Sequence, residues 1–128
     1  MISRRSINIP GFNHGRQPIP AASRVGNIVA TGGVHGMDPA TGSIPADAAA
    51  QVKNAFANLV KILAAAGATP QQVVKITVFV KGAEVRELVN AEWLALFPDP
   101  DSRPARHTLN HELNPPQVVQ LEALAVVS

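Results

Sequence analysis

The sequence predicts a single α+β domain, residues 1–128, in which two helices pack against one face of a sheet. Three observations support this. The chain has only 128 residues, 46% of them hydrophobic, and apolar side chains recur at helical spacing in two segments. Segments rich in β-branched residues lie before, between and after these two. Such a length suits one domain, and this order of elements is typical of the α+β class.

Short strands and loops are expected in the N-terminal part of the chain. Residues 4–9 can form a strand that Pro10 ends. The Gly, Pro and Asn content of residues 12–22 indicates an irregular loop, and residues 24–30 are expected to be a strand or hairpin. The run Thr31-Gly32-Gly33 then allows either a bulge or the close approach of the backbone to a ligand.

Two segments have the apolar periodicity of amphipathic helices. The first follows Asp47, a favourable N-cap residue, and runs to Gly67. The second covers about residues 84–97 and ends at the Pro-Asp-Pro-Asp run of residues 98–101. Between them, residues 73–81 are expected to form a strand, one face of which carries Val74, Ile76, Val78 and Val80.

Two further strands are expected at residues 105–113 and 117–127, and the short turn between them predicts antiparallel neighbours. Two helices can cover one face of the sheet only. The other face would carry apolar side chains, namely Val73, Phe79, Val118, Leu124 and Val126. Exposing such a patch costs about 25 cal/mol per Å². We therefore expect a homo-oligomer, although the pattern leaves the number of subunits open.

Composition excludes several classes of function. The absence of cysteine excludes disulfides, a thiolate nucleophile and zinc sites with sulfur ligands. No segment approaches the roughly 20 apolar residues of a membrane span, which favours a cytoplasmic protein. The formal net charge is only +2, and the basic residues beyond Arg4 and Arg5 are scattered, so nucleic acid is an unfavoured partner.

Glu122 is a candidate catalytic residue because it lies in the most apolar strand of the sequence. Burial of a carboxylate without a partner raises its pKa, so that it can act as a general acid or base near neutral pH. The alternative is an edge position, at which Glu122 faces solvent or pairs with Lys75 or Lys81.

Arg106, near the start of the preceding strand, is a candidate for binding a carboxylate. A guanidinium offers two parallel charge-assisted hydrogen bonds that a lysine does not reproduce. The alternative is a structural ion pair between Arg106 and Glu122 on neighbouring strands.

Metal and cofactor motifs are not found. His107 and His111 can face the same side of a strand, but they lack a third ligand, so no metal site is expected. The Gly-rich residues 31–36 do not have the spacing of dinucleotide or P-loop motifs. We expect no cofactor.

Several short motifs occur in an order that resembles a known family. They are Val25-Gly26-Asn27, Thr31-Gly32-Gly33, Gln51 with Asn58, Ala66-Gly67, residues 74–81, Val89-Asn90-Ala91, Pro104-Ala105-Arg106 and Leu121-Glu122-Ala123-Leu124-Ala125. Over about residues 18–127 the chain resembles the Rid family, also called YjgF/YER057c/UK114.

The resemblance implies a chorismate-mutase-like α+β fold that assembles as a homotrimer, with sites in the clefts between subunits. It implies hydrolysis of carboxylate-bearing enamines and imines to 2-keto acids and ammonia, without metal or cofactor. Arg106 would hold the substrate carboxylate, and Glu122 would position or activate the water. The backbone around Thr108 and Gly33 would orient the imine, and Asn90 would help to shape the site.

Three positions depart from the best-known deaminases of that family. Ile19 stands where they have Tyr, Gly32 where they have Ser, and Thr108 where they have Cys. These changes alter the pocket wall, and Ile19 favours a bulkier or less polar imine or enamine. Two other functions stay open: a non-catalytic trimer that binds small carboxylates, and an RNA-directed endoribonuclease or translation inhibitor.

Overall fold

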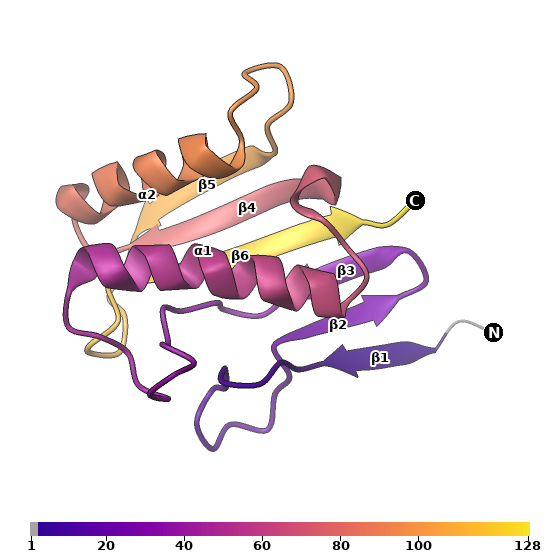
Figure 1. Cartoon of the computed structure of the whole chain (residues 1–128), viewed down its shortest axis with the longest axis horizontal. Coiled ribbons are helices and arrows are strands. Elements are labelled where there is room, and N and C mark those ends of the chain that lie inside the picture. Colours follow the sequence, from indigo (N-terminus) through magenta and orange to yellow (C-terminus); the bar gives the residue numbers. More distant parts are fainter. Residues whose placement is uncertain (1–2) are drawn as a thin grey trace.

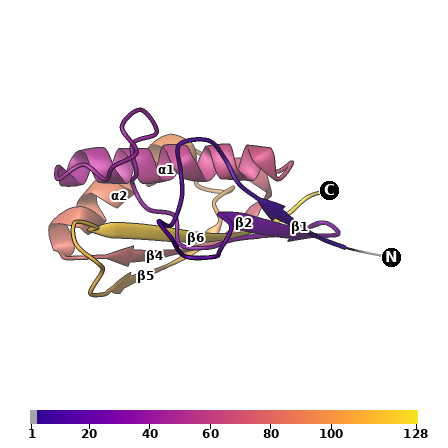
Figure 2. The same cartoon turned by 90° about the horizontal axis from the view of Figure 1, so that it is seen from below.

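The computed structural model describes residues 3–128, in which two helices lie on one side of a six-stranded sheet (Figure 1). The helices are α1 (Ala48–Ala65) and α2 (Ala83–Leu96), and a 3-10 turn, η1 (Pro70–Gln72), precedes the fourth strand. The strands are β1 (Arg4–Ile7), β2 (Ala22–Val25), β3 (Ile28–Thr31), β4 (Val73–Val80), β5 (Ala105–Asn110) and β6 (Val119–Val126). An edge-on view shows both helices over the same face (Figure 2). The predicted α+β class with two helices on one face is confirmed.

The sheet is mixed and has the strand order β1-β2-β3-β6-β4-β5. Strands β4 and β5 are parallel, whereas β6 is antiparallel to both β3 and β4. The prediction that residues 105–113 and 117–127 form neighbouring strands is wrong, because β4 lies between β5 and β6. A helical crossover such as α2 places the next strand parallel to the previous one. Strand β5 therefore occupies one edge of β4, and β6 pairs with the other.

Helix α1 begins and ends where the sequence predicts. Asp47 is its N-cap, and Oδ2 of Asp47 accepts a hydrogen bond from the Ala50 N–H at 3.0 Å. Gly67 follows the end of the helix with a φ of +83°, a conformation that glycine adopts at low cost. The apolar side chains that α1 buries against the sheet are Val52, Ala55, Phe56, Leu59, Ile62 and Leu63.

Two buried polar side chains of α1 bind the main chain of other segments. The Gln51 amide donates to the carbonyls of Pro45 at 2.8 Å and Pro116 at 2.7 Å, and its oxygen accepts from the Val118 N–H at 2.9 Å. The Asn58 amide donates to the carbonyls of His35 at 3.1 Å and Met37 at 2.9 Å. Helix α1 thereby fixes the segments before β6 and after β3, in agreement with the requirement that buried polar groups be hydrogen-bonded.

Strand β4 contains a register shift near its start. Val73 pairs with Ala125, but Lys75 already pairs with Leu124, so Val74 is an extra residue. An extra residue reverses which side chains face the core. Val73 is therefore buried under the helices and Val74 is 50% exposed. The predicted facing of these two valines is wrong for this reason, whereas Ile76, Val78 and Val80 are buried on one face as predicted.

The sheet face opposite the helices carries exposed apolar side chains. Ile28, Leu124 and Val126 are 51%, 42% and 40% exposed, and Phe79 lies half-buried on the same face. Val118, which was expected there, packs instead against the core. We call Ile28, Phe79, Leu124 and Val126 the open-face patch. A patch of this kind is the surface on which the predicted oligomer depends.

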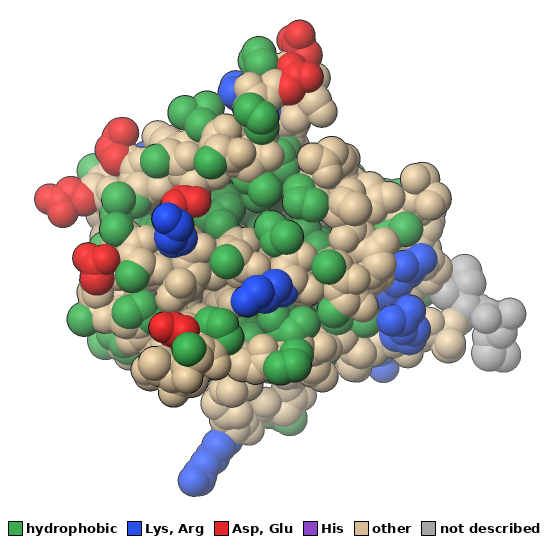
Figure 3. All heavy atoms as spheres, viewed as in Figure 1, with side chains coloured by type: hydrophobic (Ala, Val, Ile, Leu, Met, Phe, Trp, Pro, Cys, Tyr) green, Lys and Arg blue, Asp and Glu red, His purple; other side chains and the backbone are tan. Residues whose placement is uncertain are grey.

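Charged side chains are unevenly distributed over the molecule. No acidic residue precedes Asp38 in the sequence, whereas four arginines do. On the helix side, basic side chains gather near the β1–β2 end, and acidic ones lie mainly at the opposite end and around the loop after α2 (Figure 3).

None of the helices within residues 3–128 has the length and apolar character needed to cross a membrane.

Candidate active site

Arg106 lies on the edge strand β5 and faces the helix-covered side, because it pairs with Ile76, which is fully buried there. Its Nε donates to Thr108 Oγ1 at 2.7 Å, and its Nη2 donates to Asn90 Oδ1 at 2.7 Å. The guanidinium carbon lies 5.1 Å from the centroid of the Trp93 ring, within cation–π range. These three contacts hold the guanidinium in one orientation.

The local sequence explains why these side chains converge. Arg106 and Thr108 are two residues apart on a strand and therefore point to the same face. Asn90 and Trp93 are three residues apart on α2 and therefore lie on the same side of the helix. The predicted residues Arg106, Thr108 and Asn90 are thus brought together. Trp93 was expected only as a core residue, although its spacing from Asn90 is a signal that could have placed it here.

Among residues 3–128, no carboxylate lies within ion-pair distance of Arg106. Its bonded partners are neutral and use two of the five guanidinium N–H groups. Burial, and then the charge of Arg86, lower the pKa of Arg106. The guanidinium nevertheless stays charged, because an arginine is protonated at any physiological pH. A half-buried charge held only by neutral groups can bind a carboxylate with its remaining donors.

Glu122 faces the opposite side of the sheet. It pairs with Thr77 of β4, and its chain neighbours Leu121 and Ala123 are buried under the helices. Its side chain is exposed and lines a shallow cavity of about 200 Å³ together with Lys75 and Thr77. The burial expected from its apolar strand does not occur within one chain.

The two predicted catalytic residues therefore do not meet within one chain. Arg106 and Glu122 lie on opposite faces, on strands that β4 separates. The alternative of a structural ion pair between them is wrong for the same reason. The expected pairing of Glu122 with Lys75 or Lys81 is also not found, and Lys81 instead lies 3.8 Å from Glu112.

Thr31, Gly32 and Gly33 form a bulge. Ala30 pairs with Leu124, and the next bridge joins Val34 to Leu121, so four steps along one strand match three along the other. The predicted bulge is confirmed. A Cβ on Gly33 would lie 2.6 Å from Oε1 of Gln120, so the end of this flexible side chain would have to move to accommodate a larger residue. Gln120 and Glu122 share the open face of β6, which places Gly33 beside the Glu122 side of the sheet.

Ile19 lies in the loop that joins β1 to β2, and its side chain is 53% exposed. The Gly32 N–H donates to the Ala21 carbonyl at 2.9 Å, which holds the end of this loop against the bulge. A Cβ on Gly32 would meet nothing closer than 3.7 Å. The space around position 32 therefore does not require a glycine. Ile19 lies two residues before Ala21, whose carbonyl accepts the hydrogen bond from Gly32.

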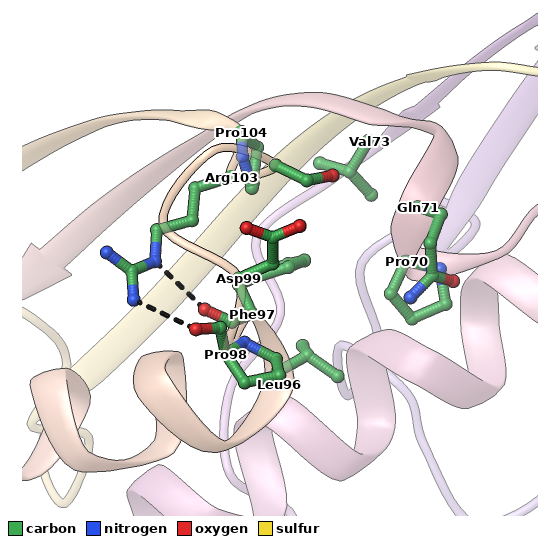
Figure 4. A pocket seen from close by; sticks show the side chains of 10 residues that line it. Pro70, Gln71, Val73, Leu96, Phe97, Pro98, Asp99, Arg103 and Pro104 are labelled. Carbon is green, nitrogen blue, oxygen red and sulfur yellow. Dashed lines mark hydrogen bonds between the residues drawn. The ribbon is translucent and has the colours of Figure 1, made fainter.

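A larger cavity, of about 420 Å³, lies between η1, the end of α2 and the loop that follows it (Figure 4). Its two charged side chains, Arg103 and Asp99, already bind main-chain groups within the fold. Arg103 Nε donates to the Phe97 carbonyl at 2.9 Å, and Asp99 Oδ1 accepts from the Asp101 N–H at 2.9 Å. None of the predicted site residues lines it. We therefore place the candidate site at Arg106 and Glu122 and not at this cavity.

Within residues 3–128, no three His, Asp or Glu side chains lie close enough together to share a metal ion. His107 lies on β5 and His111 just beyond its end.

Comparison with known proteins agrees with the fold. Residues 17–127 match the family described as Endoribonuclease L-PSP. The chain is 38% identical over 104 residues to the 2-iminobutanoate/2-iminopropanoate deaminase of Escherichia coli K12. The aligned region covers 80% of this chain and 81% of the relative.

Two solved structures from E. coli have the same fold. The crystal structure of the YjgF gene product superposes with a TM-score of 0.84 at 32% identity, covering 95% of this chain and 98% of that one. The crystal structure of TdcF with bound serine superposes with a TM-score of 0.86 at 26% identity, covering 97% of this chain and 99% of that one. The order of motifs, the sheet topology and these similarities show that the chain belongs to the Endoribonuclease L-PSP family, also known as the YjgF/Rid family.

Proposed function

We propose that this protein hydrolyses imines and enamines that carry a carboxylate, releasing a 2-keto acid and ammonia. The observation that carries the proposal is the Arg106 guanidinium, which Asn90, Thr108 and Trp93 hold in place without neutralising it. Support also comes from the 38% identical E. coli relative, which is named a 2-iminobutanoate/2-iminopropanoate deaminase, and from the related fold that was crystallised with serine, a small carboxylate.

The reaction depends on orientation of the substrate and on proton transfer, and it does not need a strong nucleophile. The imine carbon is already electrophilic, so a water molecule adds to it when Glu122 accepts a proton from that water. Glu122 passes that proton to the nitrogen, which gives a carbinolamine. The hydroxyl proton of this intermediate then also moves to the nitrogen, the carbon–nitrogen bond breaks, and ammonia leaves as the carbonyl forms. An enamine first gains a proton at carbon and loses one from nitrogen to become the imine. Arg106 holds the carboxylate beside the reacting carbon, which supplies proximity. One acid/base group contributes roughly 10²- to 10⁴-fold.

The site requires two copies of the chain. Arg106 and Glu122 cannot act on one substrate within a single protomer, because the sheet lies between them. Two different surfaces of the chain then meet at each site, and a repeated contact of this kind forms a ring where the rotation between neighbouring copies closes. A homotrimer, which the family resemblance implies, would bury the open-face patch and contain three such sites.

Mixed assemblies test both the chemistry and the shared site. Arg106→Ala and Glu122→Gln chains, each with a different affinity tag, are expressed together and purified through both tags. Ammonia release is followed with an enzyme that generates 2-aminoacrylate. Each variant alone is expected to lose the acceleration. The mixture should recover about a third of wild-type activity, because each mixed trimer that carries both tags has one site of three that combines both intact residues.

The outcomes distinguish the alternatives. Activity of Arg106→Ala equal to wild type would contradict the deaminase. Inactive variants whose mixture stays inactive would contradict a site shared between copies. Binding of 2-ketobutyrate without turnover by the wild type would favour a non-catalytic carboxylate-binding trimer. RNA binding that weakens with salt would favour the RNA-directed alternative.

We further propose that the preferred substrate has an apolar side chain, because the exposed Ile19 lies two residues before Ala21, whose carbonyl accepts from the Gly32 N–H at the bulge. The test compares imines generated from alanine-like and from longer aliphatic amino acids. The wild type should favour the longer one, and Ile19→Tyr should reduce that preference. Equal preference ratios in the two proteins would contradict this assignment.

A further inference from the structure

His14 connects the loop between β1 and β2 to the Gly33 bulge. Its Nε2 lies 2.7 Å from the Gly33 carbonyl oxygen. A carbonyl oxygen only accepts, so Nε2 carries the proton and donates it. The side chain is half-buried, and the contact spans 19 residues of sequence. No pattern in the sequence indicates this contact, and the family motifs do not include His14.

The two peptide groups that flank Gly33 are both fixed. The Thr31 hydroxyl donates to the Gly32 carbonyl at 2.8 Å, which orients the peptide that contains the Gly33 N–H. The next peptide is held by His14 at its oxygen and by the Val34 N–H, which donates to Leu121 at 2.7 Å. The Gly33 N–H itself has no hydrogen-bond partner within residues 3–128. The bulge therefore presents one oriented donor.

His14 is itself held by an aromatic cluster. Its ring lies edge-on to Phe12 at 5.2 Å and to His35 at 5.4 Å, and Phe12 stacks on His35 at 4.6 Å between centroids. The Nε2 of the buried His35 donates to the Asn13 carbonyl at 2.9 Å, which anchors the loop at the residue before His14. His14 has little freedom to move away from Gly33.

We propose that His14 is a positioning residue for the deamination site. By holding the Gly33 carbonyl, it keeps the Gly33 N–H directed at the substrate, where the donor stabilises charge that develops on the reacting group. This inference rests on the proposed function, and it adds to the machinery a residue that never touches the substrate. An oriented backbone donor acts mainly on the transition state, so its loss lowers kcat more than it weakens binding.

A matched pair of variants tests the proposal. The amide of Gln reaches the level of the histidine Nε2 and can donate to Gly33, whereas Asn ends at the level of Nδ1 and is too short. His14→Asn is expected to lower kcat by about tenfold or more. His14→Gln should remain within about threefold of the wild type. The Kd for 2-ketobutyrate should change little in either variant, because the Arg106 contacts are intact.

Controls separate the possible failures. Gln71→Ala, which removes an exposed polar side chain of η1 outside the site, should leave kcat unchanged. Equal kcat in His14→Asn and wild type, or equal loss in the Asn and Gln variants, would overturn the positioning role while Arg106→Ala remains inactive. Loss of kcat and 2-ketobutyrate binding together would also overturn it, because it would indicate general damage to the fold. Full activity of Arg106→Ala would instead contradict the proposed function.

Discussion

Arg106 and Glu122 project from opposite faces of one sheet, with β4 between the strands that carry them. Each therefore belongs to a separate half of the candidate site. The half around Arg106 is built from β5 and α2 and can hold an anion. The half around Glu122 is built from β6, the Gly33 bulge and the loop that contains His14. Neither half contains both a carboxylate-binding group and an acid/base group.

Asn90 orients the Arg106 guanidinium without cancelling its positive charge. An aspartate at this position, Asn90→Asp, should cancel that charge. The new carboxylate would form an ion pair with Nη2 and repel the carboxylate of the substrate. We expect KM to rise by about tenfold or more, with no loss of thermal stability. Steady-state kinetics and thermal unfolding check this. Asn110→Asp, at the exposed end of β5, is the control and should leave KM unchanged.

Trp93 is the only tryptophan of the chain and lies 5.1 Å from the Arg106 guanidinium. A carboxylate bound by Arg106 changes the electrostatic field at the indole ring. Titration with 2-ketobutyrate should therefore change the intrinsic fluorescence in a saturable manner. Arg106→Ala should abolish the change. A saturable signal that persists in this variant would place carboxylate binding elsewhere.

His35 is predicted to make stability dependent on pH. Burial is the largest cause that lowers its pKa below 6.5, and the charge of His14 adds to it, although the hydrogen bond to Asn13 opposes the shift. Below pH 6.5 the unfolded chain binds a proton that the folded chain does not. Stability is therefore lost as the pH falls below 6.5, with a slope of up to about 1.4 kcal/mol per pH unit.

Denaturant unfolding at several pH values between 5 and 8 measures this effect. In His35→Leu the component due to His35 is removed, so the free energy of unfolding should fall less steeply below pH 6.5 than in the wild type. Parallel curves for the two proteins would show that His35 does not titrate in this way. His35→Leu also removes the donor to the Asn13 carbonyl, so the comparison is made on the pH dependence of the free energy of unfolding and not on its absolute value.

Gly36 and Gly33 should respond differently to alanine. A Cβ on Gly36 would lie 2.3 Å from the main-chain oxygen of Gln51 in α1, and the helix backbone cannot yield. Gly36→Ala should therefore cost about 1 to 3 kcal/mol of stability. The Cβ of Gly33→Ala meets only the flexible end of Gln120. That variant should unfold nearly like the wild type but lose activity, and equal unfolding midpoints of both variants would contradict this distinction.

Local patterns in the sequence predicted the elements but not how they pair. The Asp47 cap, the Gly67 end and the helical periodicity are properties of adjacent residues, and the structure confirms them. The position of β4 between β5 and β6 depends on the crossover through α2, which short-range turn signals do not encode. The register shift at Val74 was missed for a related reason, since one extra residue leaves the β-branched composition unchanged.

The candidate site was predicted in part. Arg106, Asn90 and Thr108 were identified through the family motifs, and the structure brings them together. Arg106 and Glu122 were expected on neighbouring strands, which the sheet topology contradicts, because β4 lies between β5 and β6. His14 could not be identified, because its contact with Gly33 joins two loops with no periodic pattern. Contacts between irregular segments depend on the complete fold and not on local propensity.

Gln51 and Asn58 of α1 bind only main-chain atoms in the segments next to the bulge and before β6. Such anchorage does not depend on which side chains those segments carry. Substitutions there can therefore alter the pocket while the loop paths are conserved, which offers an evolutionary route to new substrates. For enzyme engineering, this means that libraries should randomise these segments and leave the two amides of α1 untouched.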